Sequence, residues 1–225
     1  MQRFAIIGLG RFGSRLAANL AEIGQEVIGI DRDPTIIEDM RDRITLAIAL
    51  DATDEQALRA QGIDGVDTAV VGIASSFEAS ALATVMLKRV GVPRVVSRAV
   101  SPAAAQILAS IGADEVVNPE DEAADRWAHR LISPQFIRQF ELEQGFSLVE
   151  LPTPRKWVGK TLAELHLRAR EGLHVVAVRR RRDPDDEHSP VTFQIPSPEQ
   201  PLADHEVLVL MGRDADLASL PKARE

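Results

Sequence analysis

The sequence predicts an α/β fold in which a doubly wound parallel sheet is followed by a smaller α+β domain. In the first half of the chain, short apolar segments rich in Val and Ile alternate with segments of helical periodicity, which is typical of successive β–α–β units. These apolar segments are hydrophobic on both faces, as expected of strands that helices cover from both sides. The alternation stops after residue 118, and a different pattern begins near residue 146.

The elements of the first domain follow from this alternation. The expected strands are Phe4–Gly8, Glu26–Asp31, Thr45–Leu50, Asp67–Ile73, Arg94–Arg98 and Glu115–Asn118. The helices expected between them are Arg11–Ile23, Pro34–Arg41, Asp54–Gln61, Phe77–Val90 and Pro102–Ile111. Two of these helices begin with an N-cap residue followed by proline, at Asp33-Pro34 and Ser101-Pro102, which fixes their starts.

The remainder of the chain predicts a connecting segment and a second domain. A helix is expected over Glu120–Leu131, then a break at Ser133-Pro134 and a short helix over Pro134–Phe140. The elements expected after these are strand Phe146–Leu151, helix Thr161–Arg170, strand Leu173–Arg179, loop Arg182–Pro190, strands Val191–Ile195 and Glu206–Met211, and a terminal helix from Asp214. We therefore expect a first domain over residues 1–132, a linker over 133–144 and a second domain over 145–225.

Composition excludes several classes of function. The 225 residues include no cysteine, which excludes disulfide scaffolds, thiolate metal sites and cysteine nucleophiles. The formal net charge of -8 argues against a broad electrostatic surface for nucleic acid or an anionic membrane. No apolar run approaches the roughly 18–20 residues that span a bilayer, and the N-terminal segment has the pattern of a strand and not of a signal peptide. We therefore expect a cytoplasmic protein that binds no nucleic acid.

A glycine-rich turn predicts a nucleotide site. Gly8, Gly10 and Gly13 have the spacing G-x-G-x-x-G directly after the first strand and at the start of the first helix. This is the context of the Rossmann fingerprint, in which the first glycine permits the turn, the second admits a phosphate and the third permits close helix–strand packing. Asp31 ends the second strand, where a carboxylate accepts ribose hydroxyls and disfavours the 2′-phosphate of NADP.

The fingerprint does not identify the nucleotide. Arg11 lies inside the glycine-rich turn, where a cation opposes the helix dipole but could pair with an additional phosphate. That placement favours ATP or ADP. Asp31 suits NAD(H) equally well, so NAD(H) remains an alternative ligand.

The sequence contains no recognisable catalytic motif. The chain has no tyrosine, and its five histidines all follow residue 118, where the alternation of strands and helices ends. No spaced histidine pair, nucleophile elbow or P-loop is found. These absences favour a non-enzymatic sensor, in which binding biases conformation. A small NAD-dependent oxidoreductase with an unrecognised catalytic group remains the alternative.

Several ordered motifs resemble the RCK (KTN) domains of bacterial potassium channels and transporters. The motifs that carry the resemblance are Ile6 to Gly13, Val27 to Asp31, Asp51-Ala52-Thr53, Ile111 to Asp114, and Pro119-Glu120. The second domain resembles the RCK C-terminal (TrkA-C) domain through Gly159 to Leu162, Val175 to Val178 and Asp204 to Gly212. The resemblance covers almost the whole chain and is strongest to the KtrA/TrkA-type cytosolic regulatory subunits of potassium uptake systems.

The resemblance implies a regulatory ring that is built from dimers, commonly as an octamer. Such a ring docks on the cytoplasmic face of a separate potassium-translocating membrane subunit of KtrB or TrkH type, and its shape under ATP or ADP controls potassium flux. Some relatives bind cyclic di-AMP between their C-terminal domains, although no residue set in this sequence indicates that ligand.

The resemblance also implies a role for individual residues. Gly8, Gly10 and Gly13 would lie along the phosphates, with Phe12 in the same nucleotide site, and Arg11 would reach the terminal phosphate, often across a dimer. Asp31, Arg32 and Asp33 would lie at the ribose, Asp51, Ala52 and Thr53 near the adenine, and Ala74 and Ser75 along the cleft. Arg98 would contact a phosphate, and Glu120 would help to hold a Mg²⁺ or Na⁺ ion beside it.

The segment between the domains resembles a crossover and hinge that ties two protomers together. The resemblance assigns the helix near Glu120–Leu131 and the break at Ser133-Pro134 to this role. Trp127, Phe136 and Phe140 would then be buried between subunits.

Overall fold

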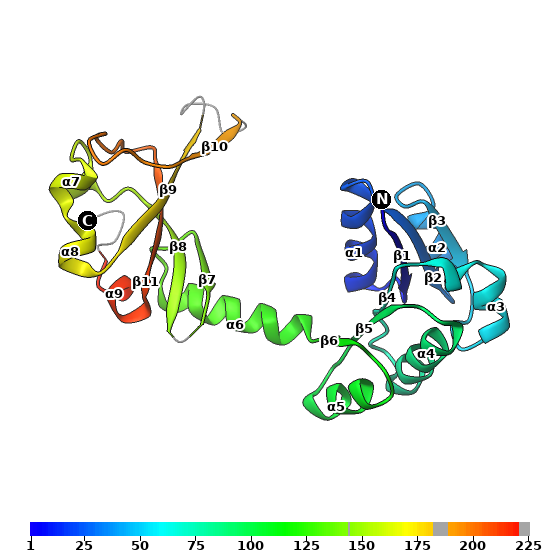
Figure 1. The fold of residues 1–225 in the computed structure, drawn as a ribbon. Coiled ribbons are helices and arrows are strands. Elements are labelled where there is room, and N and C mark those ends of the chain that lie inside the picture. Colours follow the sequence, from blue (N-terminus) through cyan, green and yellow to red (C-terminus); the bar gives the residue numbers. More distant parts are fainter. Residues whose placement is uncertain (144, 182–188, 221–225) are drawn as a thin grey trace. The chain divides into compact units, whose positions relative to one another are not determined.

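The protein consists of two units. The computed structural model describes residues 1–143, 145–181 and 189–220. Internal contacts divide the chain into Met1–Glu122 and Ala123–Glu225 (Figure 1). This division falls within the helix expected over Glu120–Leu131.

Unit 1 is built on a parallel sheet, as expected. Its strands are β1 (Arg3–Ile7), β2 (Glu26–Asp31), β3 (Leu46–Ala49), β4 (Thr68–Val71), β5 (Arg94–Arg98) and β6 (Glu115–Val117). They pair in the order β3-β2-β1-β4-β5-β6. This order reverses direction between β1 and β4, which is the defining feature of the Rossmann-type doubly wound sheet. The predicted α/β fold class is confirmed.

Helices cover both faces of this sheet. They are α1 (Arg11–Glu22), α2 (Pro34–Met40), α3 (Glu55–Ala60), α4 (Phe77–Val90) and α5 (Pro102–Ser110), with a 3-10 turn at Ile63–Gly65. The predicted N-caps are confirmed, since the side chains of Asp33 and Ser101 accept hydrogen bonds from the backbone N–H groups of Thr35 and Ala104.

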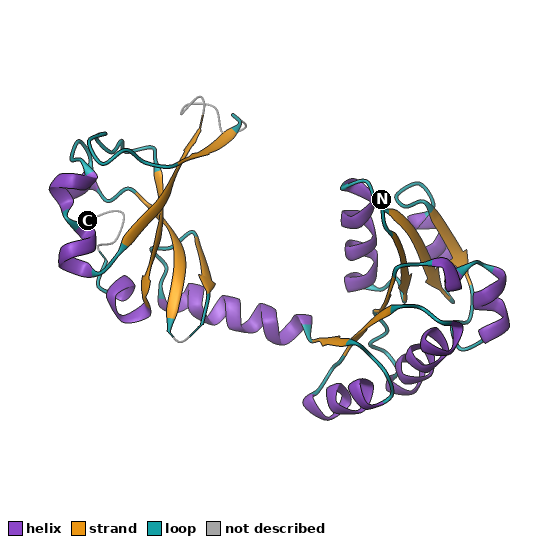
Figure 2. Cartoon of the chain, viewed as in Figure 1, coloured by secondary structure: helices purple, strands orange, loops and turns teal. Residues whose placement is uncertain are grey.

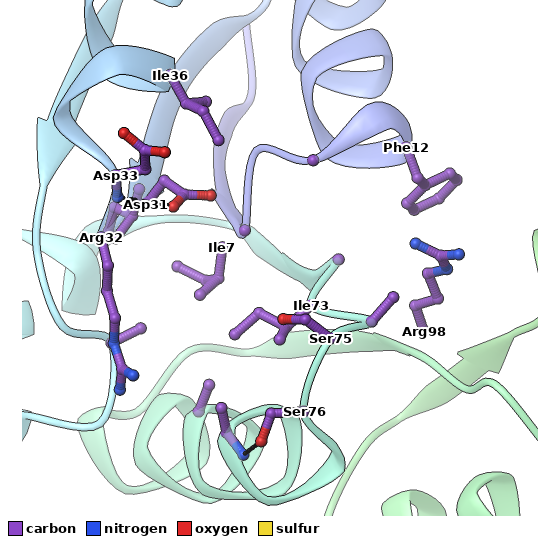
Figure 3. A pocket seen from close by; sticks show the side chains of 18 of the residues that line it. Ile7, Phe12, Asp31, Arg32, Asp33, Ile36, Ile73, Ser75, Ser76 and Arg98 are labelled. Carbon is purple, nitrogen blue, oxygen red and sulfur yellow. Dashed lines mark hydrogen bonds between the residues drawn. The ribbon is translucent and has the colours of Figure 1, made fainter.

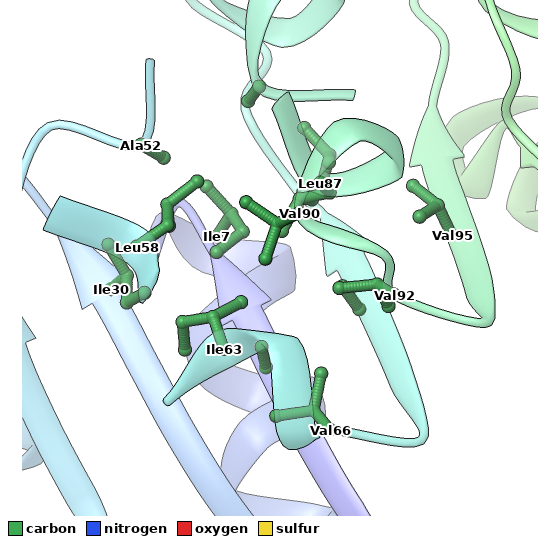
Figure 4. Close-up of a cluster of buried hydrophobic side chains, with 14 of the residues drawn as sticks. Ile7, Ile30, Ala52, Leu58, Ile63, Val66, Leu87, Val90, Val92 and Val95 are labelled. Carbon is green, nitrogen blue, oxygen red and sulfur yellow. The ribbon is translucent and has the colours of Figure 1, made fainter. Parts of the chain in front are cut away.

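The core of unit 1 lies in two layers, one on each face of the sheet. Side chains of α1 and α2 pack on the face that carries Ile6, Val27 and Val70. Residues of α3 and α4, among them Leu58 and Leu87, pack on the opposite face (Figure 4). Because neighbouring residues of a strand point to opposite faces, nearly continuous apolar strands are what this architecture requires.

The helix α6 (Pro119–Ile132) follows β6 and matches the expected Glu120–Leu131. It buries none of its residues. Its C-terminal half exposes large apolar side chains, with Trp127, Leu131 and Ile132 at 53%, 74% and 81% exposure. Among the described residues, none of the helices combines the length and apolarity that a bilayer-spanning segment needs.

Unit 2 contains an antiparallel sheet with short helices (Figure 2). Its strands are β7 (Arg138–Glu141), β8 (Phe146–Pro152), β9 (His174–Arg181), β10 (Val191–Gln194) and β11 (Val207–Arg213), in the order β10-β9-β11-β8-β7. Its helices are α7 (Leu162–Leu165), α8 (Leu167–Glu171) and α9 (Asp214–Ala218), with a 3-10 turn at Arg155–Trp157. The predicted small α+β domain is confirmed, and most of the loop Arg182–Pro190 lies outside the described residues.

Three expectations for the second half of the chain are wrong. The expected helix Pro134–Phe140 is replaced by β7, in which Phe140 pairs with Leu148 of β8. The expected helix Thr161–Arg170 is two short helices, because His166 adopts a left-handed conformation with φ 49° between them. Phe136 is not available for a subunit interface, since it is 5% exposed and belongs to the core of unit 2. Trp127 and Phe140 are about half exposed.

Candidate functional site

A cavity of about 1000 Å³ opens at the carboxyl ends of the parallel strands of unit 1 (Figure 3). It lies where the strand order reverses, which is where open α/β sheets bind their ligands. The lining residues are Ile7, Gly8, Gly10, Arg11, Phe12, Arg15, Ile30, Asp31, Arg32, Asp33, Ile36, Leu50, Asp51, Ala52, Thr53, Gly72, Ile73, Ala74, Ser75, Ser76, Ala79, Ala83, Arg98 and Glu120.

The structure brings all but one of the sequence-predicted site residues to this cavity. The exception is Gly13, which does not line it. A Cβ atom on Gly13 would lie 2.0 Å from the carbonyl oxygen of Gly8. Gly13 therefore serves the close packing of α1 against the turn, as the fingerprint predicts for its third glycine.

The first two glycines shape the cavity in different ways. Gly8 has a φ of +86°, and a Cβ there would meet the Cγ1 atom of Ile73 at 2.8 Å. Gly10 is the N-cap of α1, and a Cβ there would meet nothing within 4 Å. The space beside Gly10 is thus open to a ligand, at the end of a helix whose first N–H groups have no partner within the helix.

Backbone N–H groups hold the Asp31 carboxylate at the end of β2. Its Oδ2 accepts a hydrogen bond of 2.7 Å from the Leu9 N–H, and its Oδ1 accepts one of 3.0 Å from the Asp33 N–H. Each carboxylate oxygen has a second lone pair, so Asp31 can also accept hydrogen bonds from ligand hydroxyls. The Asp33 carboxylate is used locally, because it caps α2.

An ion pair borders the same end of the cavity. Arg32 Nη2 lies 2.6 Å from Asp51 Oδ1, which also accepts hydrogen bonds from the backbone N–H and the hydroxyl of Thr53. The Thr53 N–H and then the Arg32 guanidinium lower the pKa of Asp51 to about 2, because both favour its ionised form. The loop 51–53 is therefore held in place beside the cavity before any ligand arrives.

The opposite end of the cavity is formed around Arg98 (Figure 3). The Arg98 guanidinium lies over the Phe12 ring, 5.7 Å from its centroid, and forms an ion pair with Glu120 at the start of α6. Its side chain is only 13% exposed, and its Nε atom is buried without a hydrogen-bond partner. A buried, unsatisfied donor on a cation fits an anionic ligand at this end.

Sequence reasoning missed some of the lining residues. Arg15 lies one turn after Arg11 on α1, and the i, i+4 spacing could have indicated it. Ile36 and Ala79 belong to the first turns of α2 and α4. A helix that follows a parallel strand begins at the carboxyl edge of the sheet, so the first turns of these helices were predictable cavity residues.

Within the described parts of the chain, no cluster of three or more His, Asp or Glu side chains could hold a metal ion. Glu120 is the expected cation ligand, and it is paired with Arg98. A cation at Glu120 would need further oxygen ligands, which a bound phosphate could supply.

Comparisons with known proteins agree with this architecture. Residues 4–119 match the TrkA-N domain and residues 146–223 match the TrkA-C domain. The Ktr system potassium uptake protein C of Bacillus subtilis is 31% identical over 221 residues, which cover 98% of this chain and 96% of that protein. The Ktr system potassium uptake protein A of Vibrio alginolyticus is 27% identical and covers 99% of this chain and 97% of its own length.

A solved structure of the GsuK channel bound to NAD has a similar fold. Its TM-score to this chain is 0.54 at 27% sequence identity, and the match covers 96% of this chain. The same match covers 37% of the GsuK channel chain. The similarity therefore includes both units of this protein but only part of the channel.

Proposed function

Because the chain belongs to the family of proteins that join a TrkA-N domain to a TrkA-C domain, we propose that it is a nucleotide-sensing regulatory subunit of a potassium uptake system. Two Ktr potassium uptake proteins resemble it over nearly its whole length, which supports this function over that of an enzyme. The observation that carries the proposal is the cavity at the switch point of the sheet, with open space at Gly10 and a hydrogen-bonded carboxylate at Asp31.

The proposed ligand is an adenosine phosphate. Its phosphates would lie against Gly8 and Gly10 at the start of α1, and Asp31 would accept the ribose hydroxyls. Ala52 and Thr53 would border the adenine, while Ala74 and Ser75 would line the opposite wall. The volume of about 1000 Å³ lies at the upper end of the range for small-molecule sites and suits a ligand of this size.

We favour ATP and ADP over NAD(H) because of Arg11. This arginine lines the cavity and forms no hydrogen bond or ion pair with the residues that the structure describes, so a further phosphate would supply its missing partner. NAD(H) is the second candidate, and it is favoured by the similarity to the GsuK channel that binds NAD. Under either ligand, a Mg²⁺ or Na⁺ ion at Glu120 would neutralise the repulsion between that carboxylate and the phosphates.

Ligand binding would act through the ion pair between Arg98 and Glu120. A phosphate that binds Arg98 competes with Glu120, which lies in the first turn of α6, and α6 leads into unit 2. Only a difference in affinity between two conformations can shift their populations, and a tenfold difference corresponds to about 1.4 kcal/mol. Several sites in one ring would add their contributions.

The proposed partners are further copies of this chain and a membrane-embedded potassium-translocating subunit. The exposed apolar side chains of Trp127, Leu131 and Ile132 give α6 a surface suited to self-association. Dimers would assemble into a ring, as an octamer, on the cytoplasmic face of a KtrB- or TrkH-type subunit. Cyclic di-AMP at unit 2 stays a weaker candidate, since no residue set supports it.

A small NAD-dependent oxidoreductase is the alternative from another class. It predicts steady consumption of NADH in the presence of a carbonyl substrate, whereas the sensor binds NADH without turning it over.

The test is a ligand titration of the purified full-length chain after bound nucleotides have been removed. ATP, ADP, AMP, NAD and NADH are compared by calorimetry and by thermal shift. A ligand at 100 times its dissociation constant should raise the free energy of unfolding by about 2.7 kcal/mol. We expect ATP and ADP to bind and to produce different assembly dimensions by X-ray scattering. The absence of binding by every adenine compound would overturn the proposal.

A further inference from the structure

Arg15 is a second arginine that faces the cavity without a partner. It lies in α1 four residues after Arg11, a spacing that places both side chains on one face of the helix. Both residues are exposed and both line the cavity. Within residues 1–143, 145–181 and 189–220, neither makes a hydrogen bond, ion pair or ring contact. The two guanidinium groups therefore have unused donors beside the cavity.

In the absence of a ligand, the positions of Arg11 and Arg15 lower the stability of α1. Like charges at i and i+4 repel, and cations near a helix N-terminus oppose the helix dipole. No acidic residue occupies the first turn of α1 to offset them. The other two arginines of the cavity lining are both neutralised, Arg32 by Asp51 and Arg98 by Glu120. Among the described residues that line the cavity, the unpaired cations thus lie only on α1.

A dinucleotide does not need these two cations. In a Rossmann-type site, the backbone N–H groups of the glycine-rich turn and the helix N-terminus bind a pyrophosphate. Two additional guanidinium groups suit a further anionic group, because each can present a planar pair of N–H donors to phosphate oxygens. In a nucleoside triphosphate, the anionic group that follows the pyrophosphate is the third phosphate.

We propose that Arg15 acts together with Arg11 to bind the terminal phosphate of a nucleoside triphosphate, and is therefore a specificity-determining residue for ATP over ADP and NAD. This inference rests on the proposed function, since it concerns the same cavity. It assigns to Arg15 a contact that the glycine-rich fingerprint does not include. The contact contributes to ATP binding and leaves the diphosphate-binding part of the site unchanged.

The experiment measures the affinities of the full-length Arg15→Ala variant for ATP, ADP and NAD by calorimetry at one fixed salt concentration. We expect the ATP affinity to fall about tenfold, as for the loss of a hydrogen bond between charged groups, while the affinities for ADP and NAD change by less than about twofold. The Arg15→Lys variant should recover part of the ATP affinity, because it restores the charge without the planar pair of donors.

Two control variants separate this contact from general effects. Asn19→Ala alters an exposed position of the same helix outside the cavity lining, and Arg89→Ala removes a charge from the exposed end of α4. Both should leave the ratio of ATP to ADP affinity unchanged. Circular dichroism and melting temperature would verify that each variant folds, and Arg15→Gln would replace any Arg15→Ala sample that does not.

The outcomes distinguish the two levels of the proposal. An Arg15→Ala variant that binds ATP as tightly as the unmodified chain, or loses ATP and ADP affinity equally, overturns the role of Arg15 alone. An unmodified chain that binds no adenine nucleotide overturns the proposed function itself.

Discussion

Gly10 and Gly13 belong to one turn, yet a methyl group would meet different surroundings at each. At Gly10 it would meet nothing within 4 Å, so Gly10→Ala should cost less than about 1 kcal/mol of stability, the scale of a changed N-cap. At Gly13 it would overlap the Gly8 carbonyl oxygen, so Gly13→Ala should cost at least about 2 kcal/mol through overpacking. Chemical denaturation measures both values.

The Gly10→Ala variant should also lose affinity for nucleotides. Gly10→Ala fills the space proposed for a phosphate, so it should abolish nucleotide binding in a protein that is still folded. A Gly10→Ala variant that binds ATP normally would contradict the placement of the phosphates at this turn.

The pKa of Asp51 provides a test of the loop beside the cavity. Since the folded-state pKa of about 2 lies below the 3.8 of an unperturbed aspartate, the ionised carboxylate stabilises the fold above about pH 4. This contribution should be lost as the pH falls from about 4 towards 2. NMR titration of the Asp51 carboxyl carbon measures the pKa directly.

The Asp51→Asn variant should be destabilised at pH 7 by no more than about 1 kcal/mol, because the ion pair with Arg32 is half exposed. The difference from the unmodified protein should shrink as the pH falls towards 2 and vanish below it. A difference that persists there would mean that packing, and not charge, accounts for the effect.

At the cavity, sequence reasoning succeeded where the backbone alone sets the position of a residue. Asp31 and Arg98 end strands, and parallel strands place such ends along one edge. The pairing of Arg98 with Glu120 was not predictable, because it depends on where α6 begins in space. Phe136 shows the same limit, since its burial in unit 2 depends on tertiary packing.

Among the elements, β5 and α6 are connected by the pair of Arg98 and Glu120. The Glu120→Gln variant removes the carboxylate that competes with phosphate for Arg98. In the presence of EDTA, it should bind ADP about two- to fivefold more tightly than the unmodified chain, in line with the free energy of an ion pair in which one partner is exposed. Calorimetry at low salt measures this change.

Glu122→Gln is the matched control, because Glu122 is an exposed carboxylate of the same helix turn outside the cavity lining. It should leave the ADP affinity unchanged. If Glu120→Gln weakens ADP binding in EDTA, the carboxylate contacts the ligand and does not compete with it.

The prediction of a helix over Pro134–Phe140 is wrong. Ser133-Pro134 has the form of a helix start, and Phe136 and Phe140 have helical spacing. The segment instead forms β7, because residues 138–141 pair with β8 and Phe136 fills the core of unit 2. Long-range strand pairing overrides local propensity here, whereas the parallel strands of unit 1 are apolar enough to be recognised individually.

For the whole molecule, the division into two units predicts two unfolding events. The proposed nucleotide binds only unit 1, so a saturating ligand should shift one calorimetric transition upward and leave the other in place. Gly10→Ala should abolish the shift. A single transition that moves as one would show that the units unfold cooperatively.

Because α6 is exposed, the fluorescence of Trp127 can report on contacts of this helix. Of the two tryptophans, Trp157 is 4% exposed inside unit 2, while Trp127 is 53% exposed on α6 with the Arg130 guanidinium over its ring. Trp157 should emit at short wavelength in the folded protein at every concentration. The emission of Trp127 should shift to longer wavelength on dilution if another chain covers it at high concentration, and the Trp157→Phe variant would isolate that signal.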